Sequence, residues 1–250
     1  MSENLQYELV KPDSSLVNFV YCFSRMKVFS AFPEGIIIPN GRIDLIFYKT
    51  KDGNFNINLM GLETEAKETP EIHIDTFFAI SFNPLALEYM LHESIAEFVN
   101  TGKELSKDFL GFNINDLDDF EKFCLKATEK LKSLLPKEID ERKRKLFQII
   151  FENNGEVKIK ELAEKIGWSE RQINRYFTKQ LGISLKMYCN ILRFQASLIH
   201  IRKGELFPQK NYTDQSHFIK EIKKISGVSP KELQKNQNDR FLQFLMFCSE

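Results

Sequence analysis

Two segments between Ile159 and Leu233 follow one pattern, and no other feature of the chain constrains the fold as strongly. The first runs from Ile159 to Gly182, and the second runs from Tyr212 to Pro230. Both lead through an aromatic residue and a short polar stretch to a glycine, a small apolar residue and a serine. The pattern predicts two helix-turn-helix units strung on one long helix.

The first segment contains the parts of a helix-turn-helix in order. Leu162, Ala163 and Ile166 form the apolar inner face of a short helix. Gly167 permits a tight turn, and Ser169 is a favoured N-cap residue for the helix that follows. The inward stripe of that second helix has four-residue spacing and consists of Ile173, Phe177 and Leu181.

The outward side chains of the second helix suit contact with duplex DNA. Arginine forks onto guanine, asparagine and glutamine pair with adenine, and lysine holds phosphate. The expected contacts in this unit come from Ser169, Arg171, Gln172, Asn174, Arg175 and Lys179. Trp168 precedes this helix, where a core residue closing the turn and a DNA contact are equally good interpretations.

Charge is distributed unevenly along a chain of 250 residues whose 35 basic and 35 acidic side chains cancel. Residues 1–136 hold 13 Lys and Arg against 21 Asp and Glu, whereas residues 137–250 hold 22 against 14. A basic second half is expected when only that half touches phosphate. The basic run 141–145 is better explained as the solvated face of a helix than as a DNA-binding arm.

The first half predicts a small antiparallel sheet or partial barrel. Strand periodicity of two runs through 54–59 and again through 72–82, and the apolar run 43–48 is expected to be buried on both faces. Asp52-Gly53 is a hairpin turn signal between two of these strands. Two helices are expected next, one over 83–100 and one from Asn115 to Pro136. The whole chain is therefore expected to be α+β, with domains 1–136 and 137–250.

The second half resembles the AraC-type transcription regulators over about residues 140–235. The matching marks are Leu162-Ala163, Gly167, Ser169, Arg175-Tyr176-Phe177, Gly182-Ile183-Ser184, Tyr188, Arg193, Asp214-Gln215-Ser216-His217-Phe218 and Gly227-Val228-Ser229-Pro230. The resemblance implies an all-α DNA-binding domain in which the second helix of each unit enters the major groove. Carried over to the second unit, it implies base contacts from Gln215, Ser216, His217 and Lys220.

The second unit departs from the family's pattern. A full supporting helix ending in glycine and an aromatic residue is expected there, but only 205–211 lie between Gly204 and Tyr212. Pro208 would break a helix in that stretch, and Asn211 replaces the glycine. The unit is therefore expected to be truncated. Its recognition helix is expected to be held by Phe207, Tyr212, Phe218 and Ile222, with the first unit supplying most of the specificity.

The first half also resembles a small domain found ahead of AraC-type modules, through 39–47 and 82–86. The resemblance implies that this half senses a small-molecule effector or mediates contact with a protein partner or a second copy. Arg42 and Asp44 fit a structural turn or ion pair better than a catalytic pair. The apolar tail 240–247 is expected to pack on the protein or on a partner chain.

Several classes of site are not expected. Cys22, Cys124, Cys189 and Cys248 form no Cys-x-x-Cys motif, and His73 with Asp75 is better explained as outer sheet polarity than as a metal site. A lone His217 is a DNA contact or simply exposed, and no cofactor or catalytic motif is found. The absence of an apolar run of membrane-spanning length or a signal peptide predicts a cytoplasmic protein.

Two functions from other classes stay open beside a DNA-binding regulator. One is an enzyme whose first half is fused to a DNA-targeting module. The other is a protein-interaction module that has lost DNA binding through its truncated second unit. The salt dependence of binding distinguishes a protein-interaction module from a DNA-binding regulator, because phosphate contacts release counterions and apolar protein contacts do not.

Overall fold

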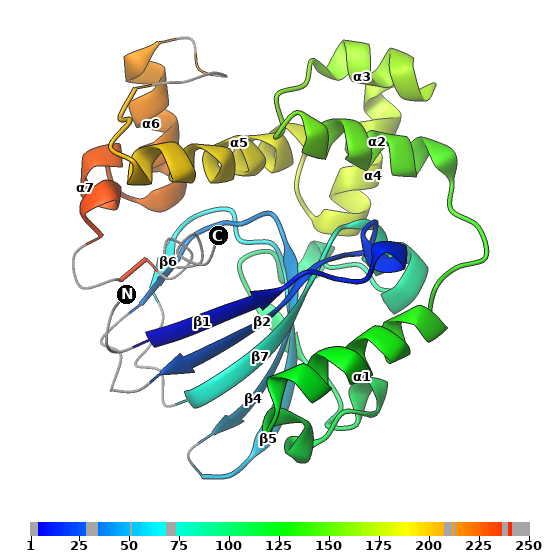
Figure 1. Cartoon of the computed structure of the whole chain (residues 1–250). Helices are drawn as coiled ribbons and strands as arrows, with labels where there is room; N and C mark the ends of the chain where they lie inside the picture. The colour runs from blue at the N-terminus through cyan, green and yellow to red at the C-terminus, as the bar shows by residue number, and fades with distance from the viewer. Residues whose placement is uncertain are drawn as a thin grey trace.

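The protein is α+β, as the sequence predicts: an antiparallel sheet lies in the N-terminal part and helices make up the C-terminal part (Figure 1). The computed structural model describes residues 5–28, 35–50, 52–68, 74–207, 212, 214–236 and 240–241. One helix, α1 (Phe120–Ser133), covers the sheet, and the remaining helices lie above the sheet's upper end.

The main sheet has the strand order β1-β2-β7-β4-β5-β8, and every neighbouring pair is antiparallel. The strands are β1 (Leu5–Val10), β2 (Val20–Val28), β4 (Ile43–Thr50), β5 (Phe55–Met60), β7 (Ile74–Phe82) and β8 (Gly102–Glu104). The predicted strands and the turn at Gly53, whose φ is 81°, are confirmed. The edge strands β1 and β8 were not predicted.

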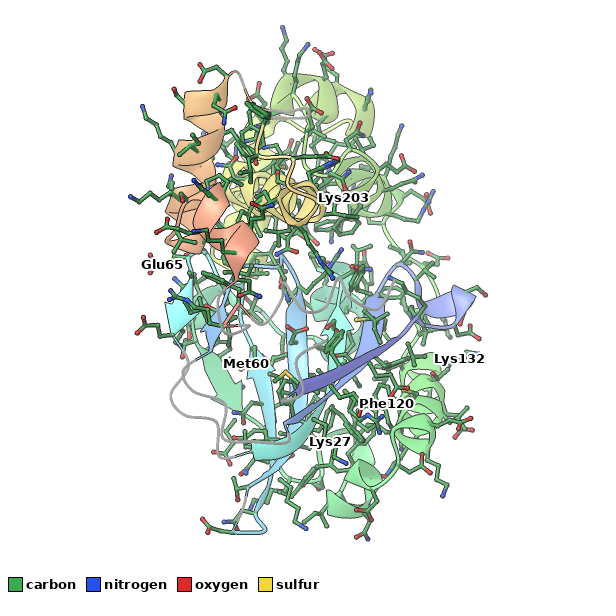
Figure 2. The ribbon with its side chains drawn as sticks, turned by 60° about the vertical axis from the view of Figure 1, so that its left-hand side comes forward. Lys27, Met60, Glu65, Phe120, Lys132 and Lys203 are labelled. Carbon is green, nitrogen blue, oxygen red and sulfur yellow. The ribbon has the colours of Figure 1, made fainter. Side chains whose placement is uncertain are left out.

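Alternation along the strands directs one face of the sheet toward α1. An aromatic cluster fills this interface: the ring of Phe123 lies 5.2 Å from Phe47, 5.1 Å from Phe78 and 5.1 Å from Phe112, centroid to centroid. Phe120 joins it from the first turn of α1, beside the sheet (Figure 2). The opposite face is half-buried along β4, so the prediction that this strand is buried on both faces was wrong.

The helix predicted over 83–100 does not form as one element. A single π-helical turn, Leu87–Leu91, ends where His92 adopts φ 52° and ψ 36°, and a 3-10 turn, Ala96–Phe98, follows. Between these turns the backbone N–H of Ile95 donates to the Gln180 carbonyl at 3.0 Å. The prediction failed because a backbone contact with the C-terminal helices replaces the local helical hydrogen bonds.

The second predicted helix begins later than expected. Asn113 caps a 3-10 turn, Ile114–Leu117, and α1 then begins after the new N-cap Asp119. The predicted stripe through Cys124, Ala127 and Leu131 is buried, and the helix ends before Pro136 as expected. Two smaller 3-10 turns, Ser14–Leu16 and Phe109–Gly111, complete this half.

The C-terminal part consists of six helices within the residues that the structure describes. They are α2 (Glu141–Glu152), α3 (Ile159–Ile166), α4 (Glu170–Leu181), α5 (Leu185–Arg202), α6 (Gln215–Ser226) and α7 (Pro230–Lys235). The predicted first helix-turn-helix is confirmed as α3–α4, with Gly167 at φ 70° between the helices. Helix α5 runs from this unit to the pair α6–α7 (Figure 1).

Buried side chains form two clusters. The main core runs without interruption from the sheet and α1 through α2, α3, α4 and the first half of α5. The smaller cluster, named here the second-unit core, joins the second half of α5 to α6 and α7. It also contains Ile36 and Ile38, which belong to the N-terminal half; Ile36 lies in the short strand β3 (Ile36–Ile37), which pairs with β6 (Lys67–Glu68).

Candidate nucleic-acid interface

Helix α4 starts with a capping box that engages two of the predicted contact residues. The Ser169 hydroxyl accepts the Gln172 backbone N–H at 3.2 Å, and the Gln172 side-chain oxygen accepts the Ser169 N–H at 2.8 Å. These bonds satisfy donors that a helix N-terminus otherwise leaves open. Ser169 and Gln172 therefore define where α4 begins, and the predicted base contact of Gln172 stays a prediction.

Three cations extend along the exposed side of α4. Arg171, Arg175 and Lys179 are exposed, and no acidic side chain within the described ranges forms an ion pair with them. Asn174 lies between them, half-buried, and its amide nitrogen donates to the Glu170 carbonyl at 3.2 Å. The helix thus offers unpaired guanidinium groups beginning in its first turn, the part of a recognition helix that contacts base edges.

A hollow of about 580 Å³ lies beside this row of cations. Its lining consists of Arg142, Trp168, Gln172, Arg175, Tyr176 and Lys179. The Trp168 ring packs on Tyr176 at 5.7 Å, and the Arg142 guanidinium lies 5.6 Å above Trp168. Trp168 is half-buried: it packs against the core and also lines this hollow, and its role as a DNA contact stays a prediction.

The basic run at the start of α2 is largely neutralised by neighbouring acids. Arg142 pairs with the N-cap Asp140 at 2.8 Å, and Arg144 pairs with Glu141 at 2.6 Å. Lys143 forms an ion pair with Glu88 of the N-terminal half. This supports the interpretation of the run as a helix face, with the exception of Arg142. Nothing in the sequence beyond its charge pointed to Arg142, because its place in the hollow depends on how α2 packs against α4.

The second recognition helix, α6, is capped by Asp214, whose carboxylate accepts the His217 N–H at 2.8 Å. Gln215 was predicted to contact a base, but its amide nitrogen donates to the Leu206 carbonyl at 2.9 Å. Gln215 therefore holds the connecting segment and is not directed outward. His217 is half-buried, and its ring lies 5.8 Å from that of Tyr212.

The outward side of α6 carries the other two predicted residues, Ser216 and Lys220, which are both exposed. Between them lies Ile219, an exposed isoleucine at 38% of its full accessibility, and Lys223 continues the same side. Apolar side chains in the major groove contact the methyl group of thymine. Ile219 was missed because an apolar residue in this helix suggests a core position, and only the packing places it outside.

The segment leading into α6 confirms part of the expected support. Tyr212, Phe218 and Ile222 belong to the second-unit core, and the Tyr212 hydroxyl lies 3.1 Å from Ser197 Oγ. Phe207 was predicted to join them, but it is 69% exposed. The described residues between α5 and α6, which are 203–207, 212 and 214, contain no helix. Pro208 and Asn211 lie outside the described residues.

Arg42 and Asp44 of the N-terminal half have structural partners. The turn before β4 is made by Asn40, whose side-chain oxygen accepts the Arg42 N–H at 2.8 Å. The Arg42 guanidinium donates to Asn83 at 2.7 Å and lies 4.0 Å from the Tyr21 ring, while Asp44 accepts from Ser81 at 2.5 Å. The structural interpretation of Arg42 and Asp44 therefore fits these contacts, without a direct ion pair.

Among the described residues, no group of three His, Cys, Asp or Glu side chains could hold a metal ion. The prediction that His73 and Asp75 are polar residues on the outer face of the sheet concerns side chains that lie outside the described part of the chain. Burial raises the pKa of the Cys22 thiol to about 11 and that of Cys124 and Cys189 to about 12. Over the same residues, no helix has both the length and the apolar composition needed to cross a membrane.

Comparison with known proteins finds no matching family model and no matching curated protein. Among solved structures, the chain is similar to ToxT from Vibrio cholerae with 12% sequence identity and a TM-score of 0.46, covering 93% of this chain and 98% of that chain. ToxT bound to (E)-4-(8-methylnaphthalen-1-yl)but-3-enoic acid is similar with 11% identity, a TM-score of 0.47 and the same coverage. A likeness at this level transfers neither ligand nor activity.

Proposed function

We propose that the protein is a sequence-specific DNA-binding regulator of the AraC type, in which α4 and α6 enter successive major-groove faces of one duplex. The observation that carries this proposal is the pair of side-chain-capped helices at the two ends of α5. Each presents exposed cations and polar side chains outward, with its apolar stripe buried, and α6 adds the exposed Ile219. A helix of this composition that faces a duplex offers both base contacts and phosphate contacts.

The length of α5 supports two-site binding. Its 18 residues span roughly 27 Å at 1.5 Å per residue. Successive major-groove faces on one side of a duplex lie roughly 34 Å apart. The connections from α5 to α4 and α6 add further reach, so a separation of this order is expected between the two recognition helices.

Different residues would carry specificity and affinity. Arg171 and Arg175 would read base edges, because a guanidinium can bond guanine through two parallel hydrogen bonds. On α6, Ser216 and Ile219 would contribute a hydroxyl and a methyl contact. Phosphate contacts would come from exposed lysines at the rim of each helix: Lys179, Lys220 and Lys223. The hollow beside α4 would extend this phosphate surface through Arg142.

The N-terminal half would act on DNA binding by sensing an effector or by self-association. Its support is the extent of the contact between the halves. The main core is continuous across them, and Glu88 receives both the Lys143 ion pair and a hydrogen bond from the Tyr176 hydroxyl at 3.3 Å. A conformational change in the N-terminal half would therefore be transmitted to α2 and α4 through direct contacts between the two halves.

Selection of bound sequences from a random duplex pool tests the proposal. The full-length protein is used, and affinity for the recovered sequence is followed over a salt series. We expect a motif spanning two major-groove faces, and an affinity that falls about a thousandfold between roughly 50 and 200 mM salt if about six phosphates are contacted.

The other outcomes are equally informative. A motif of half that length would assign base recognition to α4 alone. No enrichment together with a flat salt response would contradict DNA binding by the free protein. It would favour the alternative of a protein-interaction module, because apolar contacts release few counterions.

A further inference from the structure

The two recognition helices differ in what holds them. Helix α4 packs on α3 through Leu162 and Ile166, and on α2 and α5 through an aromatic cluster in which Phe177 lies 5.6 Å from Phe147 and 5.5 Å from Tyr188. Every one of these side chains comes from the chain after residue 137. The first unit therefore has a supporting helix and an aromatic cluster of its own, in addition to the contacts that α4 makes with Ile95 and Glu88 of the N-terminal half.

Helix α6 has no equivalent of α3 among the described residues. Its inward side chains Phe218, Ile222 and Ile225 meet α5 and Leu233 of α7. The remaining buried members of the second-unit core are Phe241 and the two N-terminal residues Ile36 and Ile38. Ile38 is fully buried and Ile36 is 7% exposed, so both contribute apolar area to the core on which α6 packs.

Hydrogen bonds hold this N-terminal segment in place along α5. The Ile36 N–H donates to the Arg240 carbonyl at 2.6 Å, and Ile36 forms a parallel bridge with Phe241. Further along, the Gln195 side chain donates to the Pro39 carbonyl, and the buried Tyr188 hydroxyl donates to the Gly41 carbonyl at 3.1 Å. The segment 36–41 thus contacts the second unit at Gln195 and Phe241, and the first half of α5 at Tyr188.

We infer that Ile36 and Ile38 are positioning residues for the second recognition helix, which has no supporting helix among the described residues. The second unit is then built from both halves of the chain, and its orientation depends on Ile36 and Ile38 of the N-terminal half, whereas α4 has the supporting helix α3. Contact with the second half-site becomes the step at which the N-terminal half controls DNA binding. This consequence rests on the proposed function, but the positioning itself does not.

Amide hydrogen exchange on the full-length protein tests the positioning without DNA. In the Ile38→Ala variant we expect exchange in α6 to accelerate about tenfold or more, while exchange in α4 stays unchanged, because local opening follows the loss of local apolar contacts. Ile57→Ala is the matched control, since Ile57 is a fully buried isoleucine of the N-terminal half that belongs to the main core. It is expected to leave the ratio of α6 to α4 exchange as in the wild type.

Equal acceleration in both helices, or no acceleration in α6, would overturn the inference. Ile38→Val keeps a branched apolar side chain and is expected to restore most of the protection. If Ile38→Ala does not fold, Ile38→Val and Ile36→Val provide the same comparison at smaller amplitude, with selective acceleration of α6 still required.

Half-site scrambling then tests the consequence for DNA. Scrambling the second half-site is expected to weaken wild-type binding but to have little further effect on Ile38→Ala, while scrambling the first half-site weakens both proteins alike. Equal sensitivity of wild type and variant to the second half-site would contradict control at that step. Failure of the wild type to bind any duplex would overturn the proposed function, and the exchange result would still decide the positioning.

Discussion

The two helix-turn-helix units each hold an exposed helix, α4 or α6, but the side chains that pack against these helices come from different parts of the chain. The first unit holds α4 with a helix of its own and an aromatic cluster centred on Phe177. The second holds α6 with α5, α7 and two isoleucines from a strand segment more than 150 positions earlier in the chain. A unit whose core is local can be recognised from local sequence, whereas a unit whose core is borrowed depends on the rest of the molecule.

The largest expected effect concerns the first helix-turn-helix unit. Phe177→Ala removes a fully buried ring from between Phe147 and Tyr188. The loss of transfer energy and the cavity left behind should lower the free energy of unfolding by about 3–5 kcal/mol. Chemical denaturation measures it, and a loss below about 1 kcal/mol would mean that the first unit is not stabilised by this cluster.

Coupling between the halves is expected to be specific to the second unit. Ile38→Ala and Ile222→Ala should each cost about 2–5 kcal/mol, and in combination should deviate from additivity by about 0.5–3 kcal/mol because the residues share one core. Ile38→Ala combined with Leu162→Ala, a residue of the first unit, should be additive. Chemical denaturation of the single and double variants gives both double-mutant cycles. Equal coupling energies in the two cycles would show that Ile38 is not coupled specifically to the second unit.

Base recognition is expected to differ from phosphate contact. Arg175→Ala should lose about 1–3 kcal/mol of discrimination at one base pair of the first half-site, since a guanidinium specifies guanine. Lys220→Ala should weaken binding to all sequences alike and reduce the salt slope by about one. The affinities of each variant for the recovered duplex and for duplexes with one base pair replaced distinguish base recognition from phosphate contact. A uniform loss for Arg175→Ala would exclude base recognition by that residue.

The smallest expected effect is the pH dependence from Asp44, which bonds Asn40 in the segment that supports the second unit. Burial raises the pKa of the Asp44 carboxyl above its ordinary value, so the folded protein favours the neutral form. The stability that this group contributes is therefore full below its unfolded pKa, about 3.9, and is lost as the pH rises through the folded pKa.

Unfolding free energies near pH 4 and pH 7 test the sign for Asp44. Wild type should lose stability relative to Asp44→Asn as the pH rises, because the variant has no carboxyl to ionise. The opposite trend would show that the hydrogen bond from Ser81 at 2.5 Å, which favours the charged carboxylate, dominates over burial.

Local patterns predicted those elements whose partners are near in sequence. Gly167 and Ser169 placed the turn and the cap of the first unit, and the alternation through Phe55–Met60 placed a strand. The helix over 83–100 was wrongly predicted, because apolar spacing alone carries no information on the contact between Ile95 and Gln180. The candidate interface shows the same dependence on local partners. Arg171 and Arg175 are exposed as predicted, whereas the side chain of Gln215 donates to the Leu206 carbonyl.

The sequence by itself determined the α+β class, the charge asymmetry and the first helix-turn-helix, since each depends on composition or on residues within a few turns of one another. Only the tertiary structure decided what supports α6, why Phe207 is exposed and why Ile219 faces outward. The physical reason is that apolar burial has no direction along the chain. Any segment that brings enough apolar surface can complete a core, and here that segment is 36–38, from the opposite half of the protein.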